Sequence, residues 1–220
     1  MKLLKNNPSI KACIFDLDGT LLDSMLLWQE VDCKYLKRYG IEFDPSFSEE
    51  IKKMTFDESA LYFIEKFHIP RTIEEIKQDW NEMIEIEYRD NIECKEGVYE
   101  LLEYFKRNNI KMCIATSCNK KHALMALQRL EILEYFEFIM TCNDVGKNKE
   151  HPDIFLTCAN QLGYKPEECF IVEDLHLAIK VAKKEGFKTI GVYDHLSAFE
   201  KKHIENLCDY YIYSFLELIV

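Results

Sequence analysis

The chain has 220 residues, of which 48% are hydrophobic, and it contains only 7 glycines and 5 prolines. This composition excludes an intrinsically disordered chain and allows one large domain or two unequal ones. The formal net charge of -11 argues against nucleic acid and anionic membranes as partners, because both select for basic surfaces.

The first predicted element is a buried parallel strand at residues 11–16, which follows from the apolar, β-prone run 12–15. Two carboxylates, Asp16 and Asp18, come at its carboxyl end, before Gly19. Residues i and i+2 of an extended segment share a face, so both carboxylates point into the crevice where open α/β sheets bind ligands. Two like charges this close need a cation between them or a proton on one of them. The pair therefore predicts a metal-assisted nucleophile beside a general acid.

The segment 24–96 is predicted to be a helical bundle inserted after this strand. Thr55-x-x-Glu58 and Thr72-x-x-Glu75 are capping boxes that open two of its helices. Apolar residues recur at helical spacing, which predicts a packed core rather than a cofactor site. These positions are Leu27, Val31, Tyr35, Ile73, Ile76, Trp80, Ile84 and Tyr88.

Beyond the insert, a helix at 97–108 leads into alternating strands and helices. The predicted strands are 111–116, 137–142, 168–173, 188–193 and 209–213, and the predicted helices are 119–130, 153–162, 175–185 and 198–207. This alternation predicts an α/β fold with a doubly wound parallel sheet. The expected domains are a core of residues 1–23 and 97–220, and a helical cap of residues 24–96.

Two later strand ends carry side chains that suit a phosphate and a metal. Thr116 and Ser117 end the second strand before a helix, where a hydroxyl and free backbone N–H groups can bind an anion. Read alone, such a residue is an ordinary helix cap. Glu173 and Asp174 end the fourth strand. Mg²⁺ takes oxygen ligands and keeps several waters, so one or two carboxylates suffice to hold it.

The string FDLDGTLLDS at residues 15–24 resembles the first motif of the haloacid dehalogenase superfamily, whose phosphatases carry DxDGT. The end of the second strand resembles the second motif. The string VGKNKEHPDIF is similar to the K-P-x-P-D-x-F of the helical-cap branch at Lys149, with Glu150 in place of the first proline. Lys147 competes for this role but has the wrong spacing. The fourth motif, E-D-S-x-x-G-I, is matched with Leu175 and Ala178 in place of serine and glycine.

The resemblance implies strand order 3-2-1-4-5 and a Mg²⁺-dependent phosphatase that works through an aspartyl-phosphate. It implies that Asp16 attacks phosphorus, while Asp18 protonates the leaving group and then deprotonates the attacking water. The implied metal ligands are Asp16, the backbone carbonyl of Asp18, and Asp174, with Glu173 in support. The implied phosphate-binding residues are Thr116, Ser117 and Lys149.

Other chemistries of the family remain open at this point. Asp18 argues against dehalogenation, and the context of Met54 lacks the lysine that phosphonate hydrolases need. A phosphomutase similar to β-phosphoglucomutase is the runner-up. Trp28 and Phe56 stand where such mutases carry His and Arg, which favours a phosphatase. A non-catalytic phosphate-binding module on the same fold is a further alternative.

The expected partner is a small phosphorylated metabolite whose identity the sequence does not specify. The protein is expected to be a monomer or a weak dimer. The start of the chain lacks the apolar core of a signal peptide, and no apolar run could span a membrane. Nine cysteines without a C-x-x-C pair are typical of reduced thiols in a cytoplasmic protein. We expect Cys13, Cys113, Cys142 and Cys169 in or beside buried strands.

Overall fold

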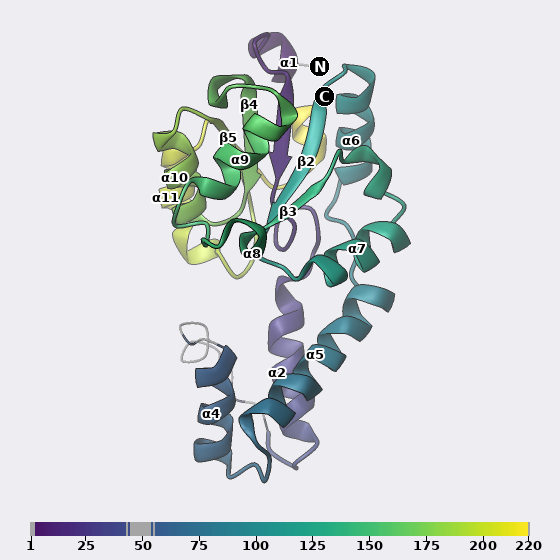
Figure 1. Cartoon of the computed structure of the whole chain (residues 1–220), viewed down its shortest axis with the longest axis vertical. Coiled ribbons are helices and arrows are strands. Elements are labelled where there is room, and N and C mark those ends of the chain that lie inside the picture. Colours follow the sequence, from purple (N-terminus) through teal and green to yellow (C-terminus); the bar gives the residue numbers. More distant parts are fainter. Residues whose placement is uncertain (1–2, 43, 45–53, 55, 220) are drawn as a thin grey trace. The chain divides into compact units, whose positions relative to one another are not determined.

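The computed structural model describes residues 3–42, 44, 54 and 56–219, except for the side chains of residues 28, 29 and 56. The chain divides into two compact units. The larger unit comprises Met1–Met25 and Ile92–Val220, and the smaller comprises Leu26–Asn91. Figure 1 labels the elements of both units.

The described part of the larger unit contains a six-stranded sheet with the order β3-β2-β1-β4-β5-β6. The strands are β1 Ala12–Phe15, β2 Lys111–Thr116, β3 Ile139–Thr141, β4 Cys169–Glu173, β5 Lys188–Val192 and β6 Tyr210–Ile212. Every neighbouring pair is parallel. The α/β fold and the expected order 3-2-1-4-5 are confirmed, and β6 extends the sheet beyond β5. The carboxyl ends of β2, β1 and β4 therefore lie side by side.

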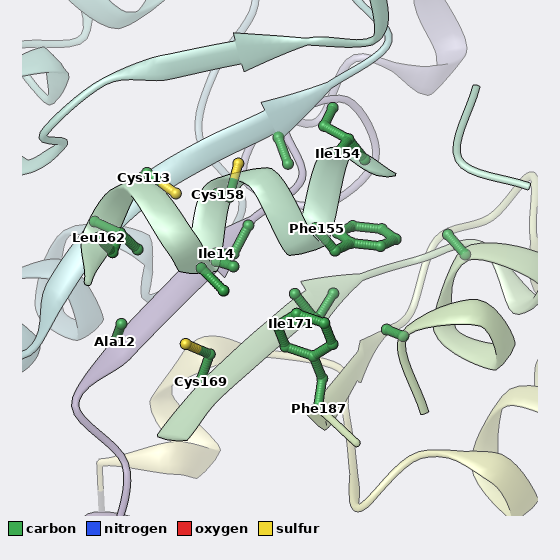
Figure 2. Packing of buried hydrophobic residues seen from close by; sticks show 14 residues of the cluster. Ala12, Ile14, Cys113, Ile154, Phe155, Cys158, Leu162, Cys169, Ile171 and Phe187 are labelled. Carbon is green, nitrogen blue, oxygen red and sulfur yellow. The ribbon is translucent and has the colours of Figure 1, made fainter. Parts of the chain in front are cut away.

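Helices cover both faces of this sheet, and this explains why β1 is apolar throughout. On one face Ile14 and Cys113 pack under α9 (Asp153–Leu162), together with Phe155 and Cys158 of that helix (Figure 2). On the other face Phe15 contacts Phe105 of α6 (Val98–Arg107), with ring centroids 6.2 Å apart. All four residues of β1 are buried, so the strand cannot show the alternation of a half-exposed one.

The remaining helices of the larger unit are short connections and crossovers. They are α1 Leu3–Asn6, α7 Lys120–Arg129, η1 Leu133–Tyr135, α8 Cys142–Val145, η2 Pro166–Glu168, α10 His176–Lys184, η3 Ala198–Glu200, α11 Lys201–Leu207 and η4 Phe215–Leu218. Two predicted elements differ from the structure. The strand expected at 137–142 is shorter, since β3 covers Ile139–Thr141, and it ends there because the capping box of Thr141 and Asp144 starts α8 at Cys142. The helix expected at 198–207 is divided into η3 and α11.

The described part of the smaller unit contains three helices: α2 Met25–Lys37, α4 Phe56–Phe67 and α5 Ile73–Asp90. The predicted capping box of Thr72 and Glu75 opens α5. Thr55 lies outside the described residues. Trp80 packs edge-on against Phe63, with ring centroids 5.0 Å apart. The apolar stripe predicted from the sequence thus forms a core, and Ile73 alone of its described members is only half-buried.

None of the nine cysteines, all of which fall within the described ranges, forms a disulfide. Cys13, Cys113 and Cys169 are buried as expected, whereas Cys142 is half-buried at the start of α8. No helix in the described part of the chain combines the length and the apolar character needed to cross a membrane.

Candidate active site

Asp16 lies directly after β1, in the middle of the sheet. Its backbone N–H donates to the carbonyl of Val172 at 2.9 Å, which continues the pairing with β4. The residue is 7% exposed. Its carboxylate accepts a hydrogen bond from the ammonium of Lys149. The first acid of the DxDGT string is therefore held at the carboxyl end of the sheet, as its spacing predicts.

Lys149 reaches the sheet from the segment between α8 and α9. It is 6% exposed, and its Nζ donates to Glu173 Oε2 at 2.8 Å as well as to Asp16. Burial would lower the pKa of this lysine, but the charges of Asp16 and Glu173 raise it well above its usual value. Lys149 is therefore charged. Lys147, the competing lysine of the same string, is exposed.

Glu173 ends β4 and is completely buried. Its Oε1 accepts the backbone N–H groups of Asp174 and Leu175, both at 3.2 Å, and its Oε2 accepts from Lys149. Burial raises its pKa to about 7, with a further contribution from Asp16 and an opposing one from Lys149. Because both carboxylate oxygens are already bonded, the geometry suits a supporting role better than direct metal ligation.

Asp174 is 1% exposed and is placed differently from its neighbour. Oδ1 accepts from the Thr20 hydroxyl at 3.3 Å, but Oδ2 has no hydrogen-bond partner among the described residues. Burial raises the pKa of Asp174 well above its usual value, and the charges of Glu173, Asp16 and Asp194 add to this shift. A buried carboxylate oxygen without a donor is costly, so this atom calls for a partner outside the chain.

The surroundings of that oxygen fit a divalent cation. Asp16, Glu173 and Asp174 each offer a carboxylate oxygen, and these oxygens lie within 4.8 Å of one another. Gly19 leaves space beside them, because a Cβ at this position would lie 2.8 Å from Asp174 Oδ2. Among the described residues, the ammonium of Lys149 pairs with two of these three buried carboxylates, those of Asp16 and Glu173. Hard oxygen ligands with an excess of negative charge are the donor set that Mg²⁺ prefers.

Asp18 lies outside this carboxylate cluster and is half-buried. Its Oδ1 accepts a hydrogen bond from Ser24 Oγ at 2.7 Å, and Ser24 is itself fully buried. The hydroxyl of Ser24 thus fixes the orientation of the candidate general acid. Ser24 was not predicted as a site residue, although it closes the FDLDGTLLDS string.

Thr116 and Ser117 follow β2, the neighbour of β1. Thr116 is 1% exposed, and its Oγ1 accepts the backbone N–H of Cys118 at 2.9 Å. Ser117 is exposed, and its Oγ lies 3.3 Å from Cys142 Sγ. Asn119, not either of these residues, caps α7. The hydroxyl of Ser117 is therefore accessible at this end of the sheet. The hydroxyl of Thr116 accepts one backbone N–H and keeps its own O–H as a donor.

The two departures from the fourth motif have separate structural outcomes. Leu175 is the N-cap of α10 and makes no side-chain cap, so its exposed side chain contributes nothing to the start of the helix. Its backbone N–H still bonds to Glu173. Ala178 is 2% exposed and packs in the core under the sheet.

Three polar residues around this site were not predicted from the sequence. Thr20 bonds to Asp174, Ser24 bonds to Asp18, and Asp194 at the end of β5 adds its charge to that of Asp174. Thr20 and Ser24 belong to the first motif, so their position was a usable signal. Asp194 lies far along the chain, and nothing in the local sequence distinguishes it. The side chains of Trp28 and Phe56 lie outside the described part of the structure.

Comparison with known proteins agrees with this geometry. A phosphorylated carbohydrates phosphatase of Thermotoga maritima is 28% identical over 181 residues, which cover 82% of this chain and 84% of that protein. A β-phosphoglucomutase of Bacillus subtilis is 31% identical, with 83% of each chain covered. The solved β-phosphoglucomutase of Clostridium difficile superposes with a TM-score of 0.69 at 27% identity, covering 95% of this chain and 93% of the other.

The family described as haloacid dehalogenase-like hydrolase matches residues 13–192. This range includes every site residue predicted from the sequence, from Asp16 to Asp174. The observed strand order β3-β2-β1-β4-β5 is also the one that the resemblance to this superfamily implies. The chain belongs to the haloacid dehalogenase-like hydrolases.

Proposed function

We propose that the protein is a Mg²⁺-dependent phosphatase that hydrolyses the phosphate monoester of a small metabolite. The observation that carries the proposal is the buried cluster of Asp16, Lys149, Glu173 and Asp174, in which Asp174 Oδ2 lacks a partner. The phosphatase of Thermotoga maritima and the mutase of Bacillus subtilis both support a substrate with a phosphate group. The net charge of -11 makes a local cation necessary for such a substrate.

Asp16 is the proposed nucleophile. Its carboxylate attacks phosphorus, the bond from phosphorus to the ester oxygen breaks, and the phosphoryl group is transferred to Asp16 as an aspartyl-phosphate. Asp18 gives a proton to the departing oxygen. A water molecule then attacks the aspartyl-phosphate and gives a proton back to Asp18, so that Asp16 and inorganic phosphate are released. The bond from Ser24 keeps the carboxylate of Asp18 in place for both transfers.

The other residues bind charge rather than exchange protons. Lys149, the hydroxyl of Thr116 and the backbone N–H of Ser117 are the proposed phosphate ligands, and the bond from the Cys118 N–H to Thr116 Oγ1 holds the Thr116 hydroxyl in place. Asp16, Asp174 and the backbone carbonyl of Asp18 would hold Mg²⁺, and Glu173 would orient both Lys149 and the segment after β4. A bound Mg²⁺ neutralises phosphate oxygens and offsets the charge of Asp16 toward its own substrate.

The test is turnover of p-nitrophenyl phosphate with and without Mg²⁺ by the wild type and by Asp16→Asn. Asn keeps the shape of the side chain but cannot act as a nucleophile, so turnover should fall by several orders of magnitude. In the wild type, BeF₃⁻ should form its adduct on Asp16. An adduct on Asp18, an active Asp16→Asn variant, or full activity in EDTA would overturn the proposal.

Phosphomutase is the second candidate, because the Bacillus subtilis relative is a β-phosphoglucomutase at 31% identity. A mutase must retain a bisphosphate while it turns over, which requires a second phosphate-binding group. Trp28 and Phe56 offer no positive charge where such mutases carry His and Arg. Release of phosphate without activation by a hexose bisphosphate supports a phosphatase. Conversion of β-glucose 1-phosphate to glucose 6-phosphate with little phosphate released would favour the mutase.

A further inference from the structure

Lys95 lies in the segment that returns from the smaller unit to α6, and its side chain is directed into the larger unit. Its Nζ donates to the carbonyl of Tyr193 and to Asp194 Oδ2, both at 2.8 Å. The side chains of Lys95 and Asp194 are only 12% and 4% exposed. The other carboxylate oxygen of Asp194 accepts the backbone N–H of Leu196 at 2.8 Å. This ion pair is thus buried, and both carboxylate oxygens of Asp194 are hydrogen-bonded.

The backbone of the same segment pairs with the residues that follow the first motif. Lys95 donates its N–H to the carbonyl of Leu21 at 2.9 Å, and Asp23 donates to the carbonyl of Glu93 at 2.9 Å. Between these bonds, Leu22 forms an antiparallel bridge with Cys94. The segment 21–23 therefore takes its position from the segment 93–95.

The segment 21–24 in turn holds Asp18. Gly19 donates its N–H to the carbonyl of Leu22 at 3.0 Å, and a backbone bridge joins Asp18 to Leu22. Ser24 then donates its hydroxyl to Asp18 Oδ1 at 2.7 Å. A displacement of Lys95 would therefore be passed through Leu21 and Leu22 to the carboxylate of Asp18.

The partner of Lys95 lies beside the other half of the site. Asp194 follows β5, which pairs with β4 so that Gly191 is level with Glu173. The charge of Asp194 acts on Asp174, the candidate metal ligand after β4. Lys95 thus ties the segment that carries Asp18 to the end of the sheet that carries the metal-binding carboxylates.

We infer that Lys95 is a positioning residue for Asp18, which it holds at the correct distance from the other acids through its bonds to Asp194, Tyr193 and Leu21. The inference rests on the proposed function, in which Asp18 protonates the leaving group. A proton donor that is displaced by about 1 Å can cost on the order of 100-fold in rate.

The consequence depends on the leaving group. Phenyl phosphate and p-nitrophenyl phosphate have similar size, but phenolate is a much stronger base than p-nitrophenolate and needs the proton from Asp18 more. A displaced Asp18 should therefore slow the hydrolysis of phenyl phosphate more than that of p-nitrophenyl phosphate. A loss of folded enzyme would instead lower both rates by the same factor. The fold should tolerate Lys95→Met, because Arg129 still binds the carbonyl of Ile92 at the start of the returning segment.

The experiment measures kcat/KM for both substrates in Lys95→Met, Asp194→Asn, the double variant and the wild type. The ratio of kcat/KM for phenyl phosphate to kcat/KM for p-nitrophenyl phosphate should fall about 10-fold or more in Lys95→Met. It should also fall in Asp194→Asn. In the double variant this ratio should fall no further than in Lys95→Met, because both substitutions break the same interaction. In Lys95→Arg the ratio should stay close to that of the wild type. The matched control is Lys106→Met, whose pair with Glu134 is exposed, at 53% and 72%.

A second readout is independent of turnover. In hydrogen exchange followed by mass spectrometry, the segment 18–24 should exchange faster in Lys95→Met than in Lys106→Met. The inference would be overturned if Lys95→Met lowered kcat/KM equally for both substrates, or if the effects of the two substitutions multiplied in the double variant. An unchanged exchange rate in the segment 18–24 would also overturn it. If the wild type hydrolyses neither ester, the proposed function fails, and the exchange experiment still decides whether Lys95 holds the segment of Asp18.

Discussion

Replacement of Lys149 by Met tests the charge balance of the buried cluster. The side chain of Lys149 is 7% exposed, and those of its partners Asp16 and Glu173 are 8% and 0% exposed. Methionine has a similar length but no charge. The substitution therefore removes the ammonium that pairs with Asp16 and Glu173 beside Asp174. Removing one partner of a buried ion pair costs about 3–5 kcal/mol, because the remaining charge stays desolvated.

This cost should appear as a fall in thermal stability in EDTA at pH 8. For a protein of this size each kcal/mol shifts Tm by about 2–4 °C, so the expected decrease is about 6–20 °C. The decrease should become smaller toward pH 5. The pKa of Glu173 is already about 7 in the presence of Lys149, and without the lysine the carboxyl takes up its proton more readily as the pH falls. Mg²⁺ at pH 8 should restore part of the lost stability, since it is a second cation for the same carboxylates.

The measurement is thermal unfolding followed by circular dichroism, with Lys147→Met as the control. Lys147 belongs to the same string but is exposed, so its replacement should shift Tm little. Adding Glu173→Gln to Lys149→Met should recover some stability, because it removes one of the uncompensated charges. A Tm for Lys149→Met within the error of Lys147→Met would refute the charge-balance reasoning, as would a decrease that is independent of both pH and Mg²⁺.

Three further predictions concern other parts of the chain. Asp174→Ala should raise the Mg²⁺ concentration needed for half-maximal turnover of p-nitrophenyl phosphate at least about 10-fold, because it removes a ligand; an unchanged requirement would exclude Asp174 as a ligand. Gly19→Ala should lower both stability and turnover, since its φ is +80° and a Cβ would lie 2.8 Å from Asp174 Oδ2; wild-type Tm and rates would contradict this. Burial raises the pKa of Asp32 in α2 to about 7, so the protonated form is favoured in the fold and stability should fall as the pH rises from about 4 to 7. Urea unfolding of Asp32→Asn should show a weaker fall over this range, and an identical pH profile would show that Asp32 is not responsible.

Much of the fold could be read from local sequence. The strands are short apolar runs, and Thr72 with Glu75 forms the capping box that their spacing predicts. Element ends were less predictable where two local signals compete. The run 137–142 is β-prone, but the bonds between Thr141 and Asp144 end the strand there and start a helix.

Part of the candidate site could likewise be predicted from the sequence, and part of it could not. Asp16, Asp18, Glu173 and Asp174 were identified because each follows an apolar run, and the ends of parallel strands meet at one edge. Lys149 was preferred to Lys147 only because its spacing to Pro152 and Asp153 fits the family motif that the string resembles. In the structure the choice is decided by burial, since Lys149 reaches Asp16 and Glu173 whereas Lys147 is exposed.

The sequence by itself determined the class of fold, the family and the acids that end the strands, because these depend on periodicity and on short contiguous motifs. Only the tertiary structure decided that Glu173 is fully hydrogen-bonded whereas Asp174 Oδ2 has no partner among the described residues. It alone paired Lys95 with Asp194, residues that are 99 positions apart. Such pairings depend on which side chains the packed sheet buries together, and no local pattern in a chain encodes the burial of a distant charge.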